Sequence, residues 1–201
     1  MDDWVLKALQ RWPNVPALFG WLGLDRRGRW LIQGGTITHP RIVQTMNRNY
    51  AADEHGRWHF QNGPQRGYIK LESTPFILFV AEDQISLVTH TGQPVERVTH
   101  AHLDEEGAVV LATEHGPGEL IGSDLSWALE RMSSQRGAID EEMLAATLNL
   151  PSGSATDITL SIASSRVPLH RLNFADAPSV LGFERDPSPR EGERVATKTI
   201  D

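Results

Sequence analysis

The sequence predicts an α+β domain in which antiparallel β-hairpins and a meander form a curled sheet or half-barrel, covered by about four short helices. Asp-x-x-Gly turns separate apolar stretches at Asp25, Asp53 and Asp104, and this turn chemistry is typical of hairpins. Apolar and polar residues alternate over residues 76–122, as in a half-buried sheet. Helical spacing of apolar residues recurs in residues 2–12, 39–48, 124–132 and 140–149.

The first elements are a helix and a hairpin. Trp4, Ala8 and Trp12 share one face of the first helix, Asp2 or Asp3 caps it, and residues 13–16 end it. Strands 18–24 and 29–33 then flank the turn at Asp25. Thr38 is predicted to cap the second helix, with Pro40 in its first turn.

A second hairpin follows at residues 57–71, around the turn 62–65, and leads into the meander. Ser123 and Asp140 are predicted to cap the third and fourth helices, and Pro151 ends the fourth. Two more strands are expected near residues 158–162 and 169–174. The predicted meander strands are 76–81, 85–90, 95–103, 108–113 and 119–122.

The predicted domain organisation is simple. Residues 1–150 form a mainly β core with its covering helices, and residues 151–184 extend the same domain by a C-terminal strand region. Residues 185–201 contain many charges and prolines and few apolar side chains, so we expect a mobile tail. The three similar turns reflect either internal duplication or convergent turn chemistry.

Composition restricts the class of protein. The formal net charge is −7, with 26 acidic against 19 basic residues, whereas nucleic-acid binding normally requires a basic surface. Cysteine is absent, which fits a reducing compartment and excludes thiolate chemistry. The first residues are acidic and no apolar run is long enough to span a membrane. We therefore expect a cytoplasmic protein that binds neither nucleic acid nor membrane.

The strongest candidate site is the hairpin at residues 57–66. On its first strand Arg57, His59 and Gln61 point to one face and Trp58 and Phe60 to the other. Guanidinium and amide groups of this kind hold carboxylates and phosphates, although the same residues also suit a purely structural turn. The candidate binding residues are Tyr50, Asp53, Arg57, Trp58, Gln61, Asn62, Gln65 and Arg66.

Histidines provide a weaker candidate. His100 and His102 lie two residues apart on one predicted strand, His90 is expected on the adjacent strand, and His-x-His spacing suits a metal ion. The alternative is an exposed polar face. Nucleophile and phosphate-loop motifs are absent from the sequence, so it predicts no catalytic residue and no cofactor.

Tryptophans are concentrated near the start of the chain, where five of the six lie within residues 4–58. They indicate either a tryptophan-rich core under the first hairpins or an apolar groove or homodimer interface. The sequence does not decide between these two uses.

A longer motif resembles the signature of a known family. Asn49-Tyr50, Asp53, Gly56-Arg57-Trp58 and the run from Phe60 to Arg66 are similar to an uncharacterised proteobacterial family with a domain of unknown function. The similarity extends from about Val5 to about Met132 and does not cover the segment from Gly137 onward. It implies a bacterial, cytoplasmic protein and supplies no activity or ligand.

The resulting functional hypothesis is a non-catalytic binding or interaction module, compatible with a homodimer. Its small-anion or partner surface would be the 57–66 hairpin. The first alternative is an enzyme acting on a small anionic metabolite, with Arg57 and Arg66 holding the anion and His59 or His55 as the base. The second alternative is a metal-binding protein that uses the strand histidines.

Overall fold

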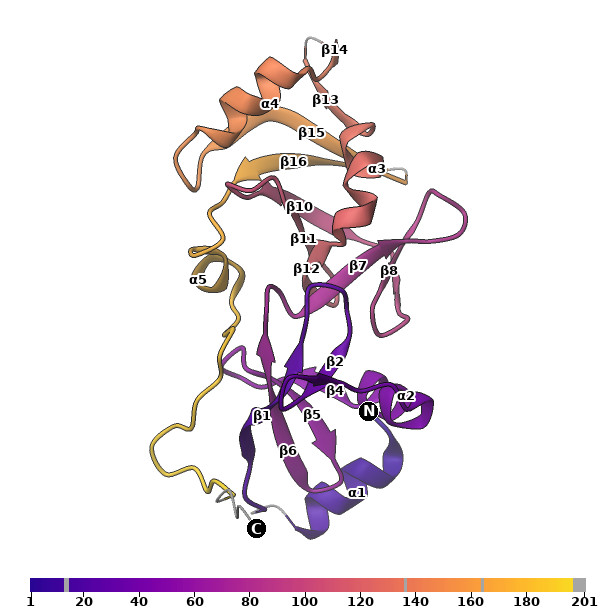
Figure 1. Ribbon diagram of the computed structural model, residues 1–201, viewed down its shortest axis with the longest axis vertical. Helices are drawn as coiled ribbons and strands as arrows, with labels where there is room; N and C mark the ends of the chain where they lie inside the picture. Colours follow the sequence, from indigo (N-terminus) through magenta and orange to yellow (C-terminus); the bar gives the residue numbers. More distant parts are fainter. Residues whose placement is uncertain (13–14, 136, 164, 197–201) are drawn as a thin grey trace. The chain divides into compact units, whose positions relative to one another are not determined.

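The computed structural model describes residues 1–12, 15–135, 137–163 and 165–196 and confirms the predicted α+β class. Its elements follow the chain in Figure 1. Two compact units are present. The first contains Met1–Asp25, Arg29–Glu72 and the chain from Gly182 onward, and the second contains Arg26–Gly28 and Ser73–Leu181. No helix in the described part of the chain is both long enough and apolar enough to cross a membrane.

The first unit contains a six-stranded sheet in the order β3-β2-β1-β6-β5-β4. The pair β1–β6 is parallel and the other pairs are antiparallel. Its elements are α1 (Asp3–Arg11), β1 (Leu18–Leu24), β2 (Trp30–Ile32), β3 (Gly35–Thr36), α2 (Pro40–Arg48), β4 (Tyr50–Ala52), β5 (Trp58–Asn62) and β6 (Gln65–Leu71).

The two helices of the first unit begin as the sequence suggests, but their caps differ. Asp2 precedes α1 without a side-chain capping bond, and its carboxylate accepts instead from Asn49 at the end of α2. The predicted cap Thr38 is wrong, because His39 precedes α2 and Pro40 already supplies the fixed φ of the first turn. The predicted stop signal at residues 13 and 14 lies outside the described residues.

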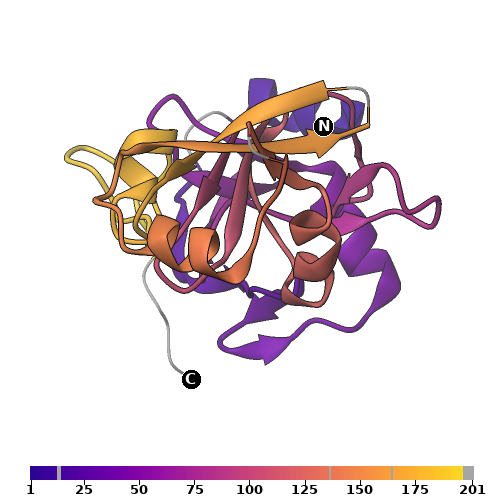
Figure 2. The ribbon, with the colours of Figure 1, turned by 90° about the horizontal axis from the view of Figure 1, so that it is seen from above.

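The second unit contains a ten-stranded mixed sheet in the order β14-β13-β15-β16-β10-β11-β12-β7-β8-β9, with parallel pairs β10–β16 and β12–β7. Its elements are β7 (Phe76–Val80), β8 (Leu87–Thr89), β9 (Pro94–Val95), β10 (Val98–Leu103), β11 (Val109–Thr113), β12 (Gly116–Leu120), η1 (Gly122–Asp124), α3 (Leu125–Leu129), β13 (Met132–Ser134), β14 (Gly137–Ala138), α4 (Glu141–Leu148), β15 (Ala155–Ile162), β16 (Ser165–Arg171) and α5 (Ala177–Leu181). The long β15–β16 hairpin is orange in Figure 2.

The predicted meander is split into two hairpin groups. The expected single strand over residues 95–103 is divided into β9 and β10. The Glu114 carboxylate accepts the backbone N–H groups of Glu96 (2.6 Å) and Arg97 (3.2 Å), which therefore do not bond to a strand partner. After this break β10 starts a second group, and its last strand β12 returns to pair in parallel with β7.

Capping of the later helices agrees only in part with the sequence. Asp140 caps α4, since its side chain accepts from the Met143 N–H at 2.8 Å. The predicted cap Ser123 lies inside η1, and its hydroxyl bonds to Asp124 instead.

The two sheets share one strand order. Sheet positions β3-β2-β1-β6-β5-β4 correspond one by one to β9-β8-β7-β12-β11-β10. A glycine of β6, Gly67, lies against Leu22 of β1, and a glycine of β12, Gly118, lies against Leu78 of β7. Asp53 and Asp104 lie in corresponding turns, β4–β5 and β10–β11, so this agreement favours internal duplication as the origin of these two turns. Asp25 lies in the β1–β2 turn, which corresponds to the β7–β8 turn instead.

The three Asp-x-x-Gly turns have one geometry. The first residues, Asp25, Asp53 and Asp104, each donate their N–H to the carbonyl four residues later, at 2.9–3.1 Å. Each carboxylate accepts the N–H of that same residue at 2.8–3.0 Å. The glycines have φ between 74° and 85°, a conformation that side chains other than glycine rarely adopt.

The tryptophans of the first unit differ in burial, and only the core role is confirmed. Trp30 and Trp58 are buried and contact Tyr50 from two sides, with ring centroids at 4.9 and 4.8 Å. Trp4 and Trp12 of the first helix region are about half exposed.

The C-terminal segment makes specific contacts with the N-terminal part of the first unit. The carbonyl of Arg185 accepts from the Leu71 N–H at 2.7 Å. Further along, Ala17 and Val195 form a parallel bridge. The mobility of residues 185–201 stays a prediction, and residues 197–201 lie outside the described residues. The predicted domain boundaries at residues 150 and 184 also stay predictions.

Candidate functional site

The hairpin β5–β6 gives the first unit a polar sheet face. His59 pairs with Tyr68 and Gln61 pairs with Arg66 in the antiparallel register, so these four side chains lie on the same face. Arg57, two residues before His59, continues the row. The predicted alternation of this strand is consistent with the register. Of the five side chains on this face, all except Arg66 are buried.

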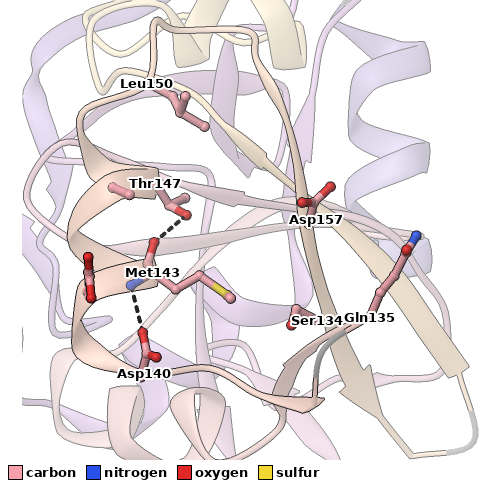
Figure 3. A pocket seen from close by; sticks show the side chains of 9 residues that line it. Ser134, Gln135, Asp140, Met143, Thr147, Leu150 and Asp157 are labelled. Atoms are coloured by element: carbon pink, nitrogen blue, oxygen red, sulfur yellow. Dashed lines mark hydrogen bonds between the residues drawn. The ribbon is translucent and has the colours of Figure 1, made fainter.

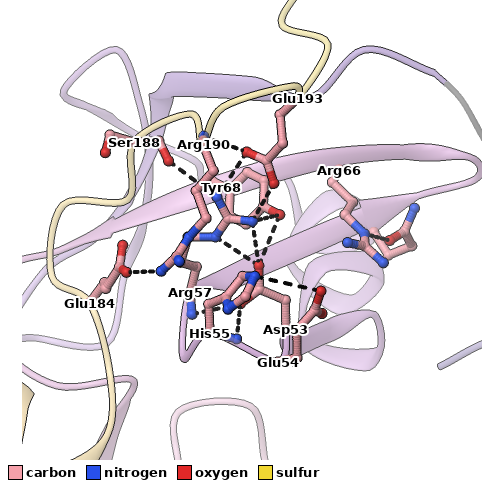
Figure 4. Close-up of polar contacts among 11 residues, drawn as sticks. Asp53, Glu54, His55, Arg57, Arg66, Tyr68, Glu184, Ser188, Arg190 and Glu193 are labelled. Carbon is pink, nitrogen blue, oxygen red and sulfur yellow. Dashed lines mark hydrogen bonds and ion pairs between the residues drawn. The ribbon is translucent and has the colours of Figure 1, made fainter.

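Arg57 lies at the centre of an ionic network (Figure 4). Its guanidinium is 2% exposed and donates to Asp53 at 2.7–2.8 Å. It also donates to both carboxylate oxygens of Glu193, at 2.9 and 2.5 Å, and to the Ser188 carbonyl at 3.2 Å. The hydrogen bonds with Glu193, followed by those with Asp53, raise the pKa of Arg57 against the opposing effect of burial.

Asp53 joins the turn to this network. One of its oxygens accepts the backbone N–H groups of His55 and Arg57, and the other accepts from the Arg57 side chain and from the Tyr68 hydroxyl at 3.1 Å. Burial raises the pKa of the Asp53 carboxyl, but the hydrogen bonds from Arg57 and His55 outweigh burial and lower it. The carboxylate is therefore charged at neutral pH.

The ring of Tyr68 packs against the Arg57 guanidinium of this network. Its ring stacks on Phe19 with centroids 4.4 Å apart, and the Arg57 guanidinium lies 4.6 Å from its centroid. Its hydroxyl accepts from Arg57 at 3.0 Å. Burial is the main cause that raises the pKa of Tyr68, so the phenol is neutral at physiological pH.

His59 lies beside Tyr68, with ring centroids 5.6 Å apart, and is 3% exposed. Burial first, and then the charge of Arg66, lower its pKa to about 4. The ring is therefore neutral at pH 7. Its Nδ1 atom is buried and has no hydrogen-bond partner among the described residues.

Gln61 and Arg66 occupy the far end of the face. The Gln61 amide donates to the carbonyls of Gly63 (2.9 Å) and Gln65 (3.2 Å), which fixes the tight turn. Its oxygen accepts from Arg66 Nε at 3.3 Å. Gln61 is therefore a structural side chain, and it orients the arginine.

The other predicted binding residues lie elsewhere. Trp58 and Tyr50 pack against each other in the core, as described above. Asn62 and Gln65 line an apolar cavity of about 210 Å³ on the opposite side of the hairpin, together with Phe60. The structure therefore brings Asp53, Arg57, Gln61 and Arg66 to one face and places the remaining candidates away from it.

A cavity of about 370 Å³ opens beside this face. Arg66, Tyr68 and Glu193 line it together with Arg194, an exposed residue of the C-terminal segment. Among the described residues neither Arg66 nor Arg194 takes part in an ion pair, and Arg66 donates a hydrogen bond to the neutral side chain of Gln61. The remaining lining residues are Leu9, Val15, Ala17, Pro64 and Gly192.

The sequence could not supply the C-terminal part of this site. Ser188 and Glu193 lie 131 and 136 residues after Arg57 in the chain. The only available signal was a glutamate within a charged segment, and such segments are usually solvated.

A larger cavity, of about 530 Å³, lies in the second unit between α4 and the strands β13 and β15 (Figure 3). Asp140, Glu142 and Asp157 make its lining acidic. Asp140 already accepts the Met143 N–H as the helix cap. Glu142 and Asp157 are exposed and Asp140 caps the helix, so the lining offers no evidence for a bound ligand.

The predicted histidine cluster is not assembled. β8, which precedes His90, pairs with β7 and β9, and β11, β12 and β7 separate it from β10 in the sheet. His100 and His102 instead neighbour His170 on β16, with ring centroids 5.7 and 5.9 Å away. Over the described part of the chain no three His, Asp or Glu side chains are placed to hold a metal ion.

A family model described as "Protein of unknown function (DUF2946)", with the family name DUF2944, matches residues 1–188. The chain belongs to this family. The predicted membership of a family of unknown function is therefore confirmed, but the expected end of the similarity near Met132 is wrong, because the match continues to residue 188. A comparison with curated proteins found no match.

Two solved structures are similar to this chain. The crystal structure of a DUF1285 family protein from Silicibacter pomeroyi DSS-3 is similar over 85% of this chain and 96% of that chain, with a TM-score of 0.52 and 16% identity. That of a DUF1285 family protein from Shewanella baltica OS155 is similar over 51% of this chain and 85% of that chain, with a TM-score of 0.40 and 14% identity. The first likeness shows the fold and carries no function with it.

Proposed function

We propose that this protein is a non-catalytic binding module that holds an anionic ligand on the polar face of the first unit. The observation that carries the proposal is the cavity of about 370 Å³ lined by Arg66 and Arg194. Three arginines, Arg57, Arg66 and Arg194, lie in or beside it, against the two carboxylates Asp53 and Glu193. The local charge therefore attracts an anion although the whole chain is acidic.

The protonation states of the lining residues support binding without acid–base chemistry. The pKa of Tyr68 is raised by burial, and the pKa of Glu193 is lowered mainly by its hydrogen bond with Arg57. A general acid or base works best with a pKa near the working pH. The neutral His59 is part of the face but is only 3% exposed, so a ligand in the cavity has no open path to it.

Thermal unfolding in the presence of citrate or inorganic phosphate tests the proposal at constant ionic strength. A ligand at 100 times its dissociation constant stabilises the native state by about 2.7 kcal/mol, or roughly 5–10 °C for a chain of this size. We expect such a shift for the wild type, a reduced one for Arg66→Lys, and none for Arg66→Ala.

Arg166→Ala is the matched control, because Arg166 is an exposed arginine on β16 of the second unit. It should keep the full shift. A full shift in Arg66→Ala, or no shift in the wild type with either anion, would rule out this site.

A further inference from the structure

The C-terminal segment itself occupies part of the site. We call residues 185–196 the strap. The strap places the Glu193 carboxylate on the buried Arg57 guanidinium through two hydrogen bonds, and the Arg190 N–H donates to the same carboxylate at 2.9 Å. A carboxylate on a buried arginine in this bidentate geometry is what an anionic ligand of the face would provide.

The strap also binds through its backbone. The Ala17 N–H donates to the Arg194 carbonyl, and the Ala196 N–H donates to the Ala17 carbonyl, both at 2.9 Å. Ala17 lies immediately before β1, and its bridge with Val195 is parallel. This is the pattern by which an extended peptide adds to a sheet: main-chain bonds supply affinity, and one side chain supplies specificity.

The family model covers the polar face but only residues 185–188 of the strap. Ala17, Arg57 and Tyr68 fall within the part of the chain that the family model matches, whereas Glu193 and Val195 lie beyond its end at residue 188. The polar face therefore belongs to the family domain, and the Glu193 carboxylate that occupies it comes from outside the matched part.

We infer that the polar face is a receptor for an extended acidic peptide, and that the strap is a built-in competitor for it. The inference rests on the proposed function and specifies its ligand. An acidic segment of a partner protein would place a glutamate or aspartate on Arg57 and pair its backbone with Ala17, and the strap would leave. Arg194 leaves with the strap, so Arg57 and Arg66 are the arginines of the face that remain to hold the peptide.

Competition sets the expected affinities. A tethered segment competes at an effective concentration in the millimolar range, so the wild type should bind an external peptide weakly. Glu193→Gln removes the charge from the bonds to Arg57 and weakens the closed state. The apparent affinity for the external peptide should then rise by about tenfold or more.

The test uses the full chain and a dye-labelled peptide with the sequence of residues 186–196, measured by fluorescence anisotropy. Glu193→Gln should bind this peptide about tenfold more tightly than the wild type. Glu191→Gln is the matched control, because it removes an exposed glutamate two residues away, and it should behave as the wild type. A second peptide carrying E193Q should bind Glu193→Gln at least about tenfold more weakly than the first.

Equal affinity of the wild type and Glu193→Gln for the acidic peptide would overturn the inference, as would equal affinity of the two peptides for Glu193→Gln. The peptide comparison does not depend on how the substitution affects folding. If citrate raises the melting temperature of the wild type but not of Arg66→Ala, and the expected differences in peptide affinity are not found, then only the inference about the peptide is wrong. If citrate does not stabilise the wild type either, the proposed function is wrong as well.

Discussion

The repeated turns allow one substitution to be made in three electrostatic settings. Asp25, Asp53 and Asp104 have the same backbone geometry. Asn can keep the Oδ1 acceptor in each turn but loses the charge. The comparison therefore isolates how much the charge of each carboxylate stabilises its interaction with the side chain four positions later.

The expected magnitudes differ because the partners differ in burial. The Arg57 side chain is 2% exposed, so Asp53→Asn leaves a buried guanidinium with Glu193 as its remaining carboxylate. Breaking a buried pair costs about 3–5 kcal/mol, and the surviving partner reduces this to about 2–4 kcal/mol. The Arg29 side chain is 49% exposed, so Asp25→Asn should cost about 0–1 kcal/mol.

Asp104→Asn provides the baseline, because Ala108 occupies the arginine position and Asp104 Oδ2 has no hydrogen-bond partner among the described residues. We expect a change within about 0.5 kcal/mol. Urea unfolding at pH 7, followed by circular dichroism, gives the three free energies. Losses of similar size for Asp53→Asn and Asp104→Asn would refute the claim that the Arg57 network stabilises the first unit.

Three further predictions concern packing, pH and capping. Gly118→Ala should lower the free energy of unfolding, measured in urea, by about 1–3 kcal/mol, because its new Cβ would lie 2.7–2.9 Å from three atoms of the buried Leu78. Gly67→Ala should lower it less, because its new Cβ would approach only the end of the Leu22 side chain. The pKa of His59 is about 4 against 6.5 unfolded, so the unfolded state gains a proton first as pH falls. From pH 6.5 to 4 the free energy of unfolding should therefore fall by about 3 kcal/mol through this group, a component that His59→Phe removes from the measured pH profile. Asp140→Ala should cost about 1 kcal/mol of helix-cap stability and Ser123→Ala under about 0.5 kcal/mol, measured by thermal unfolding.

Local chemistry in the sequence predicts much of this fold. The turns at Asp25, Asp53 and Asp104 appear where their residues require them, because a carboxylate at the first position and a glycine at the fourth satisfy the backbone of the turn by themselves. The α4 cap at Asp140 is local in the same way. Such features depend on residues within about one turn of the chain.

Sheet topology depends on distant partners, and the sequence did not predict it. The parallel pairs β1–β6 and β12–β7 join strands that are not adjacent in the chain. The short strand β4 was also missed, because Tyr50–Ala52 is too short to show a period of two. The break between β9 and β10 comes from the Glu114 carboxylate, 17–18 residues away.

The candidate site was predicted in its hairpin half only. Arg57 and Gln61 share a face because of the strand period, which the sequence shows directly, and Arg66 joins them through the register of the hairpin. Glu193 reaches Arg57 only through the folded chain, and nothing in its neighbourhood of the sequence distinguishes it from a solvated glutamate. The expectations of a homodimer and of a cytoplasmic location stay predictions.

Anion binding at the polar face is tested most directly by a heteronuclear NMR titration of the full chain with citrate. We expect the shift changes to concentrate on the amides and side chains of Arg57, Arg66 and Tyr68 and on residues 192–196, and Arg66→Ala to abolish them. Shift changes confined to the second unit, or spread over exposed lysines and arginines without saturation, would contradict it.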